Sequence, residues 1–210
     1  MPEAPLLVSQ YKSAFIALSR VSAVPSIYRD QRAEAFESGD PTGERRAARS
    51  LLRWLLATTV SVELSASSIE ARPKGQPYLT SHPAVGISVS HTAGWVAAAV
   101  NPCGAVGVDV QVPVVVSDSM LRRCCTPLGR SLLRALNREA RELEFAWLWS
   151  IQESCVKASG GGLSDRPWRI ALTPGQTSGR WRSYTWESQR SRSDVPLSCA
   201  VDSSVAEVRR

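Results

Sequence analysis

The chain has 210 residues, of which 43% are hydrophobic and 21% are charged. This length is sufficient for one large domain or two small ones, and the composition excludes a collagen-like, wholly disordered or membrane-embedded protein. The net charge of +6 favours an anionic partner, which could be a nucleic acid, a phosphorylated small molecule or an acidic protein.

Targeting signals and cysteine content together predict the cellular compartment. Residues 1–20 contain no basic segment followed by an apolar run, so we expect no signal peptide. The longest apolar runs, residues 95–100 and 112–116, are far shorter than the ~20 residues of a membrane span. The five cysteines include no CxxC pair, which argues against a zinc site and favours reduced side chains. We therefore expect a cytoplasmic protein without membrane contact.

The first predicted element is a helix over residues 42–60, with Thr42 as its N-cap and Glu44 in its first turn. At roughly 100° per residue, one side of this helix is apolar. The other side carries four arginines within one quadrant: Arg45, Arg46, Arg49 and Arg53. Such a stripe is either a solvated face or a site for an anion.

A basic turn and three short strands follow the helix. Residues 71–77 read ARPKGQP. Residues 72–77 form the basic turn, in which Arg72 and Lys74 stand beside prolines and a glycine that break helices and strands. Strands are predicted at residues 85–90, 95–100 and 105–110. Because the turns between them are short, we expect consecutive strands to pair antiparallel as a meander.

The second part of the chain is predicted to begin with a connection over residues 112–125. Thr126 and Pro127 start a helix that ends near residue 137. A longer helix covers residues 139–159 and ends at a glycine run. Two strands are expected near residues 180–187 and 197–201. This order predicts an α+β fold with two similar halves, residues 1–111 and 112–210.

Three segments carry the residues that could take part in catalysis or binding. They are Ile87-Ser-Val-Ser-His-Thr92, Gly107-Val-Asp-Val-Gln111 and Trp149-Ser-Ile-Gln-Glu-Ser-Cys-Val-Lys157, and the last is followed by glycines and Leu163. Glu153 and Lys157 are four residues apart, so they share one face of the helix. Taken singly, this pair could be a surface ion pair, and Asp109 could be a strand-end carboxylate satisfied by a turn.

Together and in this order, the segments resemble the 4'-phosphopantetheinyl transferases of the larger, monomeric type that activates surfactin synthetase and related polyketide and nonribosomal peptide synthases. The resemblance covers residues 45–163. It implies two halves related by a pseudo-twofold axis, with coenzyme A in the cleft between them. It also implies transfer of the 4'-phosphopantetheine arm to a serine of an acidic acyl or peptidyl carrier protein, with release of 3',5'-ADP. The implied partners include neither nucleic acid nor membrane.

The resemblance also implies roles for individual residues. Asp109 and Glu153 match ligands of Mg²⁺, for which Mn²⁺ is an alternative. Glu153 and Lys157 are the implied catalytic residues, with Glu153 accepting the serine proton directly or through a water on the metal. The implied coenzyme A-binding residues are Arg46, Arg53, Arg72, Lys74, Ser90, His91 and Lys157. Three glutamines, Gln76, Gln111 and Gln152, stand where relatives carry charged residues.

Two other functions compete with this interpretation. The arginine helix, together with Trp181, Tyr184 and Trp186, could form a nucleic-acid-binding module, although this leaves Asp109 and Glu153 without a role. The three glutamines motivate the other alternative, a degenerate protein that binds coenzyme A without turnover.

Overall fold

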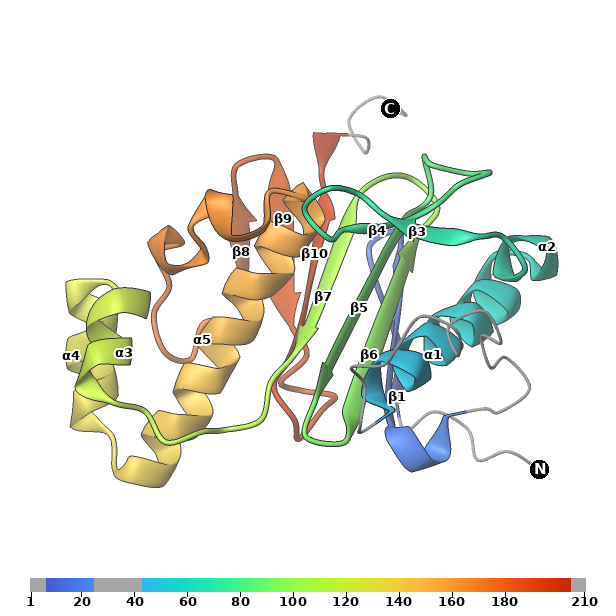
Figure 1. Cartoon of the computed structure of the whole chain (residues 1–210). Helices are drawn as coiled ribbons and strands as arrows, with labels where there is room; N and C mark the ends of the chain where they lie inside the picture. Colours follow the sequence, from blue (N-terminus) through green and yellow to red (C-terminus); the bar gives the residue numbers. More distant parts are fainter. Residues whose placement is uncertain (1–6, 25–42, 205–210) are drawn as a thin grey trace.

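The computed structural model describes residues 7–24 and 43–204, in which two four-stranded antiparallel sheets lie between two long helices (Figure 1). In the first sheet the strand order is β1 (Leu7–Tyr11), β2 (Ala14–Arg20), β6 (Trp95–Asn101) and β5 (Gly86–Thr92). In the second it is β7 (Val106–Val110), β10 (Leu197–Asp202), β9 (Tyr184–Ser188) and β8 (Ser178–Trp181). A small hairpin pairs β3 (Ile69–Ala71) with β4 (Pro77–Leu79). The predicted α+β class is confirmed.

The helices are α1 (Glu44–Thr59), α2 (Val62–Ser65), α3 (Asp118–Cys124), α4 (Pro127–Ala135) and α5 (Arg138–Ser159), and three 3-10 turns are η1 (Val21–Ala23), η4 (Gly162–Asp165) and η5 (Pro167–Arg169). Within the described ranges, none of these helices is both long and apolar enough to cross a membrane. Helix α1 begins at Glu44 with Gly43 as its N-cap. The predicted N-cap, Thr42, is therefore one residue too early, and Thr42 itself lies outside the described residues.

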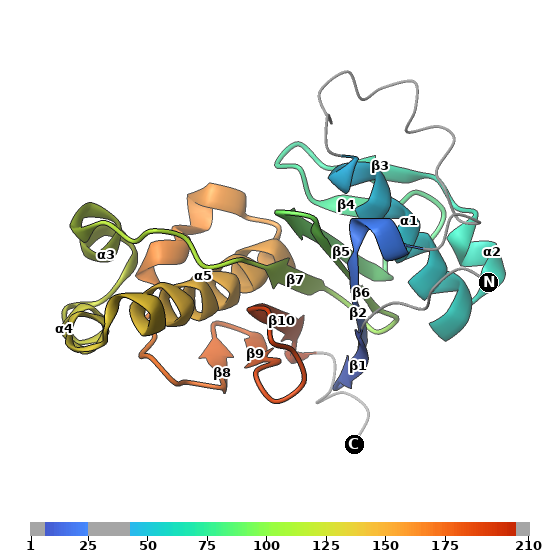
Figure 2. The same cartoon turned by 90° about the horizontal axis from the view of Figure 1, so that it is seen from below.

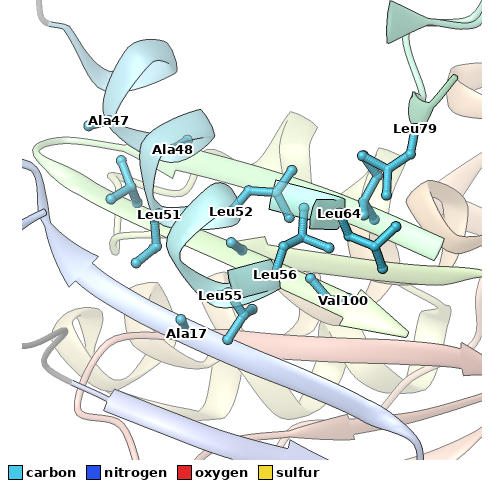
Figure 3. Packing of buried hydrophobic residues seen from close by; sticks show 13 residues of the cluster. Ala17, Ala47, Ala48, Leu51, Leu52, Leu55, Leu56, Leu64, Leu79 and Val100 are labelled. Carbon is cyan, nitrogen blue, oxygen red and sulfur yellow. The ribbon is translucent and has the colours of Figure 1, made fainter. Parts of the chain in front are cut away.

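Helix α1 covers one face of the first sheet with the apolar side that its periodicity predicts. Leu51, Leu55 and Leu56 are fully buried, and they point towards the strands beneath (Figure 3). Val96 and Val100 of β6 belong to the same cluster. A fully buried leucine contributes roughly 1.5–3 kcal/mol relative to an exposed one, so this face anchors the helix and leaves its arginines on the other side.

Strand β6 is buried along its whole length because both of its faces are covered. Val96, Ala98 and Val100 face α1. Trp95 and the intervening alanines pack against Val108, Leu197 and other residues of the second sheet. This explains why residues 95–100 read as a continuous apolar run rather than as an alternating one.

Strand β7 does not continue the predicted meander. It pairs with β10, so that Asp109 faces Ser198 across the ladder, and it shares no ladder with β6 among the described strands. The short turn before β7 favours a local hairpin with β6. Strand β7 pairs with β10 instead, because the two strands together form the apolar face that packs against the first sheet. The predicted three-strand meander is wrong in this respect, whereas the antiparallel pairing of β5 with β6 is confirmed.

Helix α5 covers the second sheet on the side opposite the first sheet, and α3 and α4 lie beyond its outer face (Figure 2). Thr126 caps α4 by accepting a hydrogen bond from the Gly129 N–H, and Asn137 caps α5 in the same way. Helix α5 ends at Gly160 with φ 68°, as the glycine run predicts. Helix α3 lies in the segment predicted as an irregular connection, and the predicted strand at residues 180–187 is the β8–β9 hairpin.

Candidate active site

The candidate site lies where the two sheets meet along β5 and β7, which are edge strands of their sheets. These strands run close together: a Cβ added to Gly86 would lie 3.1 Å from the Val106 nitrogen of β7 and 2.0 Å from the carbonyl oxygen of Gly104, just before that strand. The Ser88 hydroxyl accepts a hydrogen bond from the Val108 N–H at 3.0 Å. A side chain thus replaces a backbone partner across this seam, and the small residues of β5 allow the approach.

Asp109 is buried at the seam and is held from two sides. Its Oδ1 accepts a hydrogen bond from the Ser90 hydroxyl at 2.7 Å and from the Lys157 ammonium at 2.7 Å. Its side chain is 8% exposed, whereas that of Lys157 is 29% exposed. The apolar strand therefore carries its single carboxylate into a polar cluster rather than to a solvated turn.

Glu153 lies one helical turn before Lys157 on α5, and it is half-buried. Among the described residues it accepts no hydrogen bond from a neighbouring donor. Burial raises the pKa of its carboxyl group above the ordinary value, and the nearby charge of Asp109 raises this pKa further, while Lys157 partly offsets both effects. Two carboxylates that repel one another in a half-buried site are a suitable donor set for a cation.

The raised pKa of Glu153 predicts how the stability of the metal-free protein depends on pH. A carboxyl group with a raised pKa stabilises the folded state when protonated, and this contribution is lost as the pH rises above 4.5 and through the raised value. Glu153→Gln should therefore be more stable than the wild-type chain at neutral pH, with the difference disappearing towards acid. Urea unfolding in EDTA from pH 3.5 to 8 measures this. A difference that grows towards acid would contradict the assignment.

A cleft of about 320 Å³ opens beside these residues. It brings together the basic turn, strand β5, the last turns of α5 and the glycine run, and its lining residues are Lys74, Gly75, Gln76, Pro77, Ser88, Val89, Glu153, Val156, Lys157, Gly160 and Gly162. The basic turn and the last turns of α5, which are about 80 residues apart in the sequence, thus line the same cleft. Arg72, in the same turn, lines a neighbouring cavity of about 180 Å³.

Gln76 explains the tight contact between the basic turn and α5. Its side-chain amide donates a hydrogen bond to the Lys157 carbonyl oxygen at 3.2 Å, and this oxygen also accepts a hydrogen bond from the Gly160 N–H at 3.3 Å. A Cβ at Gly160 would lie 2.5 Å from the Gln76 amide oxygen. The glutamine therefore ties the basic turn to the C-terminal end of α5, which is a role that the sequence does not reveal.

His91 lies at the end of β5 and contacts α1 rather than the lining of the cleft. Its Nδ1 lies 3.0 Å from Oε2 of Glu44, and the other carboxylate oxygen accepts a hydrogen bond from the Gly94 N–H at 2.6 Å. Glu44 thereby fixes the turn after β5 against the first turn of α1. The sequence indicates Glu44 only as a favourable charge at a helix start, because no local signal links it to His91, which is 47 positions away.

Arg53 is directed to the other end of α1. Its guanidinium donates hydrogen bonds to the carbonyl oxygens of Ser65 and Ser67, the second at 3.0 Å. This contact stabilises the chain after α2, and a contact of Arg53 with coenzyme A stays a prediction. Arg46 lies on the same helix, and its carbonyl oxygen accepts a hydrogen bond from the Ser50 hydroxyl.

Gln111 and Trp149 lie beside the site in a separate cavity of about 260 Å³, whose other lining residues are Val114, Met120, Cys124, Phe145 and Ala146. The Gln111 amide donates a hydrogen bond to the Val112 carbonyl oxygen at 3.1 Å. Gln152 is buried and donates to the carbonyl oxygens of Cys124 and Ile170. These two glutamines satisfy backbone groups locally.

The structure gives no support to a row of stacking platforms for nucleic acid on β8 and β9. Trp186 is 1% exposed. Trp181 stacks on Tyr184 with ring centroids 6.0 Å apart, and the Arg182 guanidinium lies 4.3 Å from the Trp181 ring. All five cysteines are free.

The donor set at the seam suits a hard dication. Carboxylate oxygens are the ligands that Mg²⁺ prefers, and it is commonly held by one or two of them together with substrate phosphates. Asp109 and Glu153 provide such a pair. Within residues 7–24 and 43–204, no group of three or more His, Cys, Asp or Glu side chains is placed to hold a metal ion. The residues present therefore fit an ion whose shell is completed by phosphate oxygens and water.

Comparisons with known proteins point in the same direction. A family model described as the 4'-phosphopantetheinyl transferase superfamily matches residues 105–200, which include Asp109, Glu153 and Lys157. The 4'-phosphopantetheinyl transferase HetI of Nostoc sp. is 30% identical over 153 residues, which are 69% of this chain and 65% of the relative. A 4'-phosphopantetheinyl transferase of Bacillus subtilis is 24% identical over 145 residues, with 69% and 64% covered. The chain thus spans slightly less than two thirds of the length of these relatives.

Proposed function

We propose that this chain, which is similar to members of the 4'-phosphopantetheinyl transferase superfamily, transfers the 4'-phosphopantetheine arm of coenzyme A to a serine of an acyl or peptidyl carrier protein. The other product is 3',5'-ADP. The observation that supports this proposal best is the convergence of Asp109, Glu153 and Lys157 beside the cleft. Asp109 and Glu153 are the proposed Mg²⁺ ligands, and Mn²⁺ is an alternative ion.

The reaction exchanges one phosphorus–oxygen bond for another. The serine hydroxyl attacks the phosphorus on the pantetheine side of the pyrophosphate, and the bond to the departing 3',5'-ADP breaks. A bound dication supplies neutralisation of the phosphate charges. The Glu153 carboxylate is the proposed acceptor of the serine proton, directly or through a water.

Coenzyme A carries a pyrophosphate and a separate 3'-phosphate, so its binding requires several positive or hydrogen-bonding groups. We assign this role to Lys74 in the cleft, to Ser90 and His91 on β5, and to Arg46 and Arg72 from the flanking elements. The Glu44 carboxylate at Nδ1 of His91 orients the imidazole ring.

The remaining proposals concern the whole protein. The chain acts as a monomer of two halves, residues 1–111 and 112–210, related by a pseudo-twofold axis. Its net charge of +6 complements an acidic carrier protein. Free cysteines are compatible with the cytoplasm, where thiols stay reduced.

The function is tested by release of 3',5'-ADP and by the mass of the carrier protein. The chain is incubated with coenzyme A, Mg²⁺ and a panel of apo-carrier proteins, with EDTA and serine-to-alanine carriers as controls. We expect a stoichiometric gain of the phosphopantetheine mass on at least one carrier. Binding of coenzyme A without any product would instead identify a protein without turnover, and tight binding of nucleic acid without coenzyme A binding would favour the nucleic-acid module.

Charge reversal at Lys74 should weaken the binding of coenzyme A. Lys74→Glu should raise the KM for coenzyme A by about tenfold or more, because a charge-assisted contact is worth about 1.5–3 kcal/mol, and it should affect dephospho-coenzyme A less. Lys12→Glu is the matched control, since Lys12 lies in the β1–β2 turn over the Tyr11 ring. Equal losses for both ligands would show that Lys74 does not recognise the 3'-phosphate.

A further inference from the structure

The basic turn at the tip of the β3–β4 hairpin stands between two cavities. Gln76 and Pro77 line both the cleft of about 320 Å³ and the neighbouring cavity of about 180 Å³. Within the turn, the Arg72 N–H donates a hydrogen bond to the Gln76 carbonyl oxygen at 2.9 Å, and the Gly75 N–H donates to the Arg72 carbonyl oxygen at 2.8 Å. The turn is therefore closed on itself, and its position relative to α5 depends on the contacts that its tip makes there.

The Gln76 side chain joins this tip to the C-terminal end of α5 (Figure 1). Its amide nitrogen donates to the Lys157 carbonyl oxygen at 3.2 Å, across 81 positions of the sequence. A Cβ at Gly160 would lie 2.5 Å from the Gln76 amide oxygen. A Cβ at Gly162 would lie 3.8 Å from the Lys74 carbonyl oxygen. The glycines after α5 thus form a socket for the tip, and Gly160 leaves the space that the glutamine fills.

The socket, residues 160–162, is held in place by Asp165. The Ser159 hydroxyl donates a hydrogen bond to Oδ2 of Asp165 and accepts one from the Gly161 N–H at 3.2 Å. Arg182, in the β8–β9 hairpin, donates to Oδ1 of the same carboxylate at 2.8 Å. The glycine segment is therefore braced by the second half of the chain, so that a tip seated on it takes a defined position.

Lys74 is carried by the same tip, two residues before Gln76. It lines the cleft together with Glu153 and Lys157, but it is exposed, so the packing of its own side chain does not fix its place. The position of its ammonium group at the cleft follows from the position of the tip. Because the Gln76 amide is uncharged, its effect on an anion can be separated from the effect of the Lys74 charge.

We propose that Gln76 is a positioning residue that docks the basic turn into the glycine socket and thereby holds Lys74 at the cleft for coenzyme A. The inference rests on the proposed function for the identity of the ligand, whereas the docking is a property of the free protein. When the tip leaves the socket, Lys74 leaves with it. The apparent Kd of an anion that Lys74 binds then rises by the reciprocal of the fraction of molecules in which the tip is docked. Gln76 thus serves substrate binding without a charge of its own.

Limited proteolysis with trypsin tests the docking without any ligand. The Lys74–Gly75 bond lies in the tip and is a trypsin site, and its cleavage requires the tip to open locally. Gln76→Met keeps the length of the side chain but removes the amide donor, so we expect this bond to be cleaved about fivefold faster or more. Gln10→Met is the matched control, because the Gln10 amide donates to the Lys12 carbonyl oxygen in the β1–β2 turn. An unchanged cleavage rate in Gln76→Met would overturn the proposal.

A double-mutant cycle tests whether Gln76 acts through Lys74. In calorimetric titration with 3',5'-ADP in EDTA, Gln76→Met should weaken binding by about fivefold. The same substitution in a Lys74→Met chain should weaken binding by less than about twofold. In the transfer assay, the KM for coenzyme A should rise in Gln76→Met while kcat changes less.

Equal losses of affinity in the two backgrounds would overturn the proposal, because Gln76 would then act on the ligand independently of Lys74. Failure of the wild-type chain to bind 3',5'-ADP or to modify any carrier protein would overturn the proposed function, and with it the role of the tip in substrate binding. The rate of cleavage after Lys74 would still decide whether Gln76 docks the tip, so the two failures are distinguishable.

Discussion

Asp109→Asn and Glu153→Gln should each lower the rate of carrier-protein modification by about 1000-fold or more. Each substitution removes one of the two carboxylates that we propose to hold Mg²⁺, and the charge stabilisation supplied by a bound metal is worth several kcal/mol in the transition state. The measurement is the rate of carrier modification as a function of Mg²⁺ concentration. We expect the residual activity to require higher metal concentrations.

Substitutions at Asp109 and Glu153 should differ in their effect on the stability of the protein. Asp109→Ala should cost about 2 kcal/mol or more, since it leaves the Lys157 ammonium without the carboxylate that lies 2.7 Å away. Partial exposure of Lys157 reduces this cost. Glu153→Gln should not destabilise the metal-free protein, because it removes a charge that burial and Asp109 disfavour. Urea unfolding of both variants in EDTA distinguishes a metal ligand from a structural carboxylate.

Gln111→Ala is the matched control for this experiment. Gln111 follows Asp109 by two residues, but its side-chain amide donates a hydrogen bond to the Val112 carbonyl oxygen. The residue lines the adjacent apolar cavity. We expect a loss of less than tenfold. If Gln111→Ala were as inactive as Asp109→Asn while remaining folded, the two-carboxylate site would be wrong. Near-normal activity in Asp109→Asn would remove the basis for the proposed function.

Gly107→Ala should destabilise the protein by about 3 kcal/mol or more. The new Cβ would lie 2.0 Å from the Ser154 carbonyl oxygen and 2.4 Å from the Ala158 nitrogen. Both are backbone atoms of α5, so the clash can be relieved only by moving the whole helix away from β7, and such overpacking is among the costly core changes. Activity should fall as well, because α5 carries Glu153 and Lys157.

Gly175→Ala is the control for Gly107→Ala. Gly175 has φ +80°, but no atom lies within 4 Å of the position of its Cβ. This substitution should therefore cost only the penalty of placing an L-residue at positive φ, roughly 1–2 kcal/mol. Urea unfolding compares the two variants. If Gly107→Ala cost no more than Gly175→Ala, the close packing of α5 on β7 would be refuted.

The sequence by itself determined the elements whose signals are local. The apolar periodicity of α1 predicts the leucines that are buried against the first sheet. Thr126 and Gly160 predict one end of α4 and one end of α5, because capping depends on residues only a few positions apart. The spacing of Glu153 and Lys157 likewise predicts a shared helix face, and their order after Asp109 carries the resemblance to the 4'-phosphopantetheinyl transferases.

Only the tertiary structure decided which distant residues meet. Strand β7 pairs with β10 rather than with its neighbour in sequence, because the second sheet buries the apolar face of Val108. Gln76 binds the C-terminal end of α5, and Lys157 joins β5 to β7, although neither residue carries a local signal for its partner. Contacts between segments 50 to 80 residues apart depend on how complete sheets and helices pack, since the free energy of burial is shared by many residues and is not encoded in any one motif.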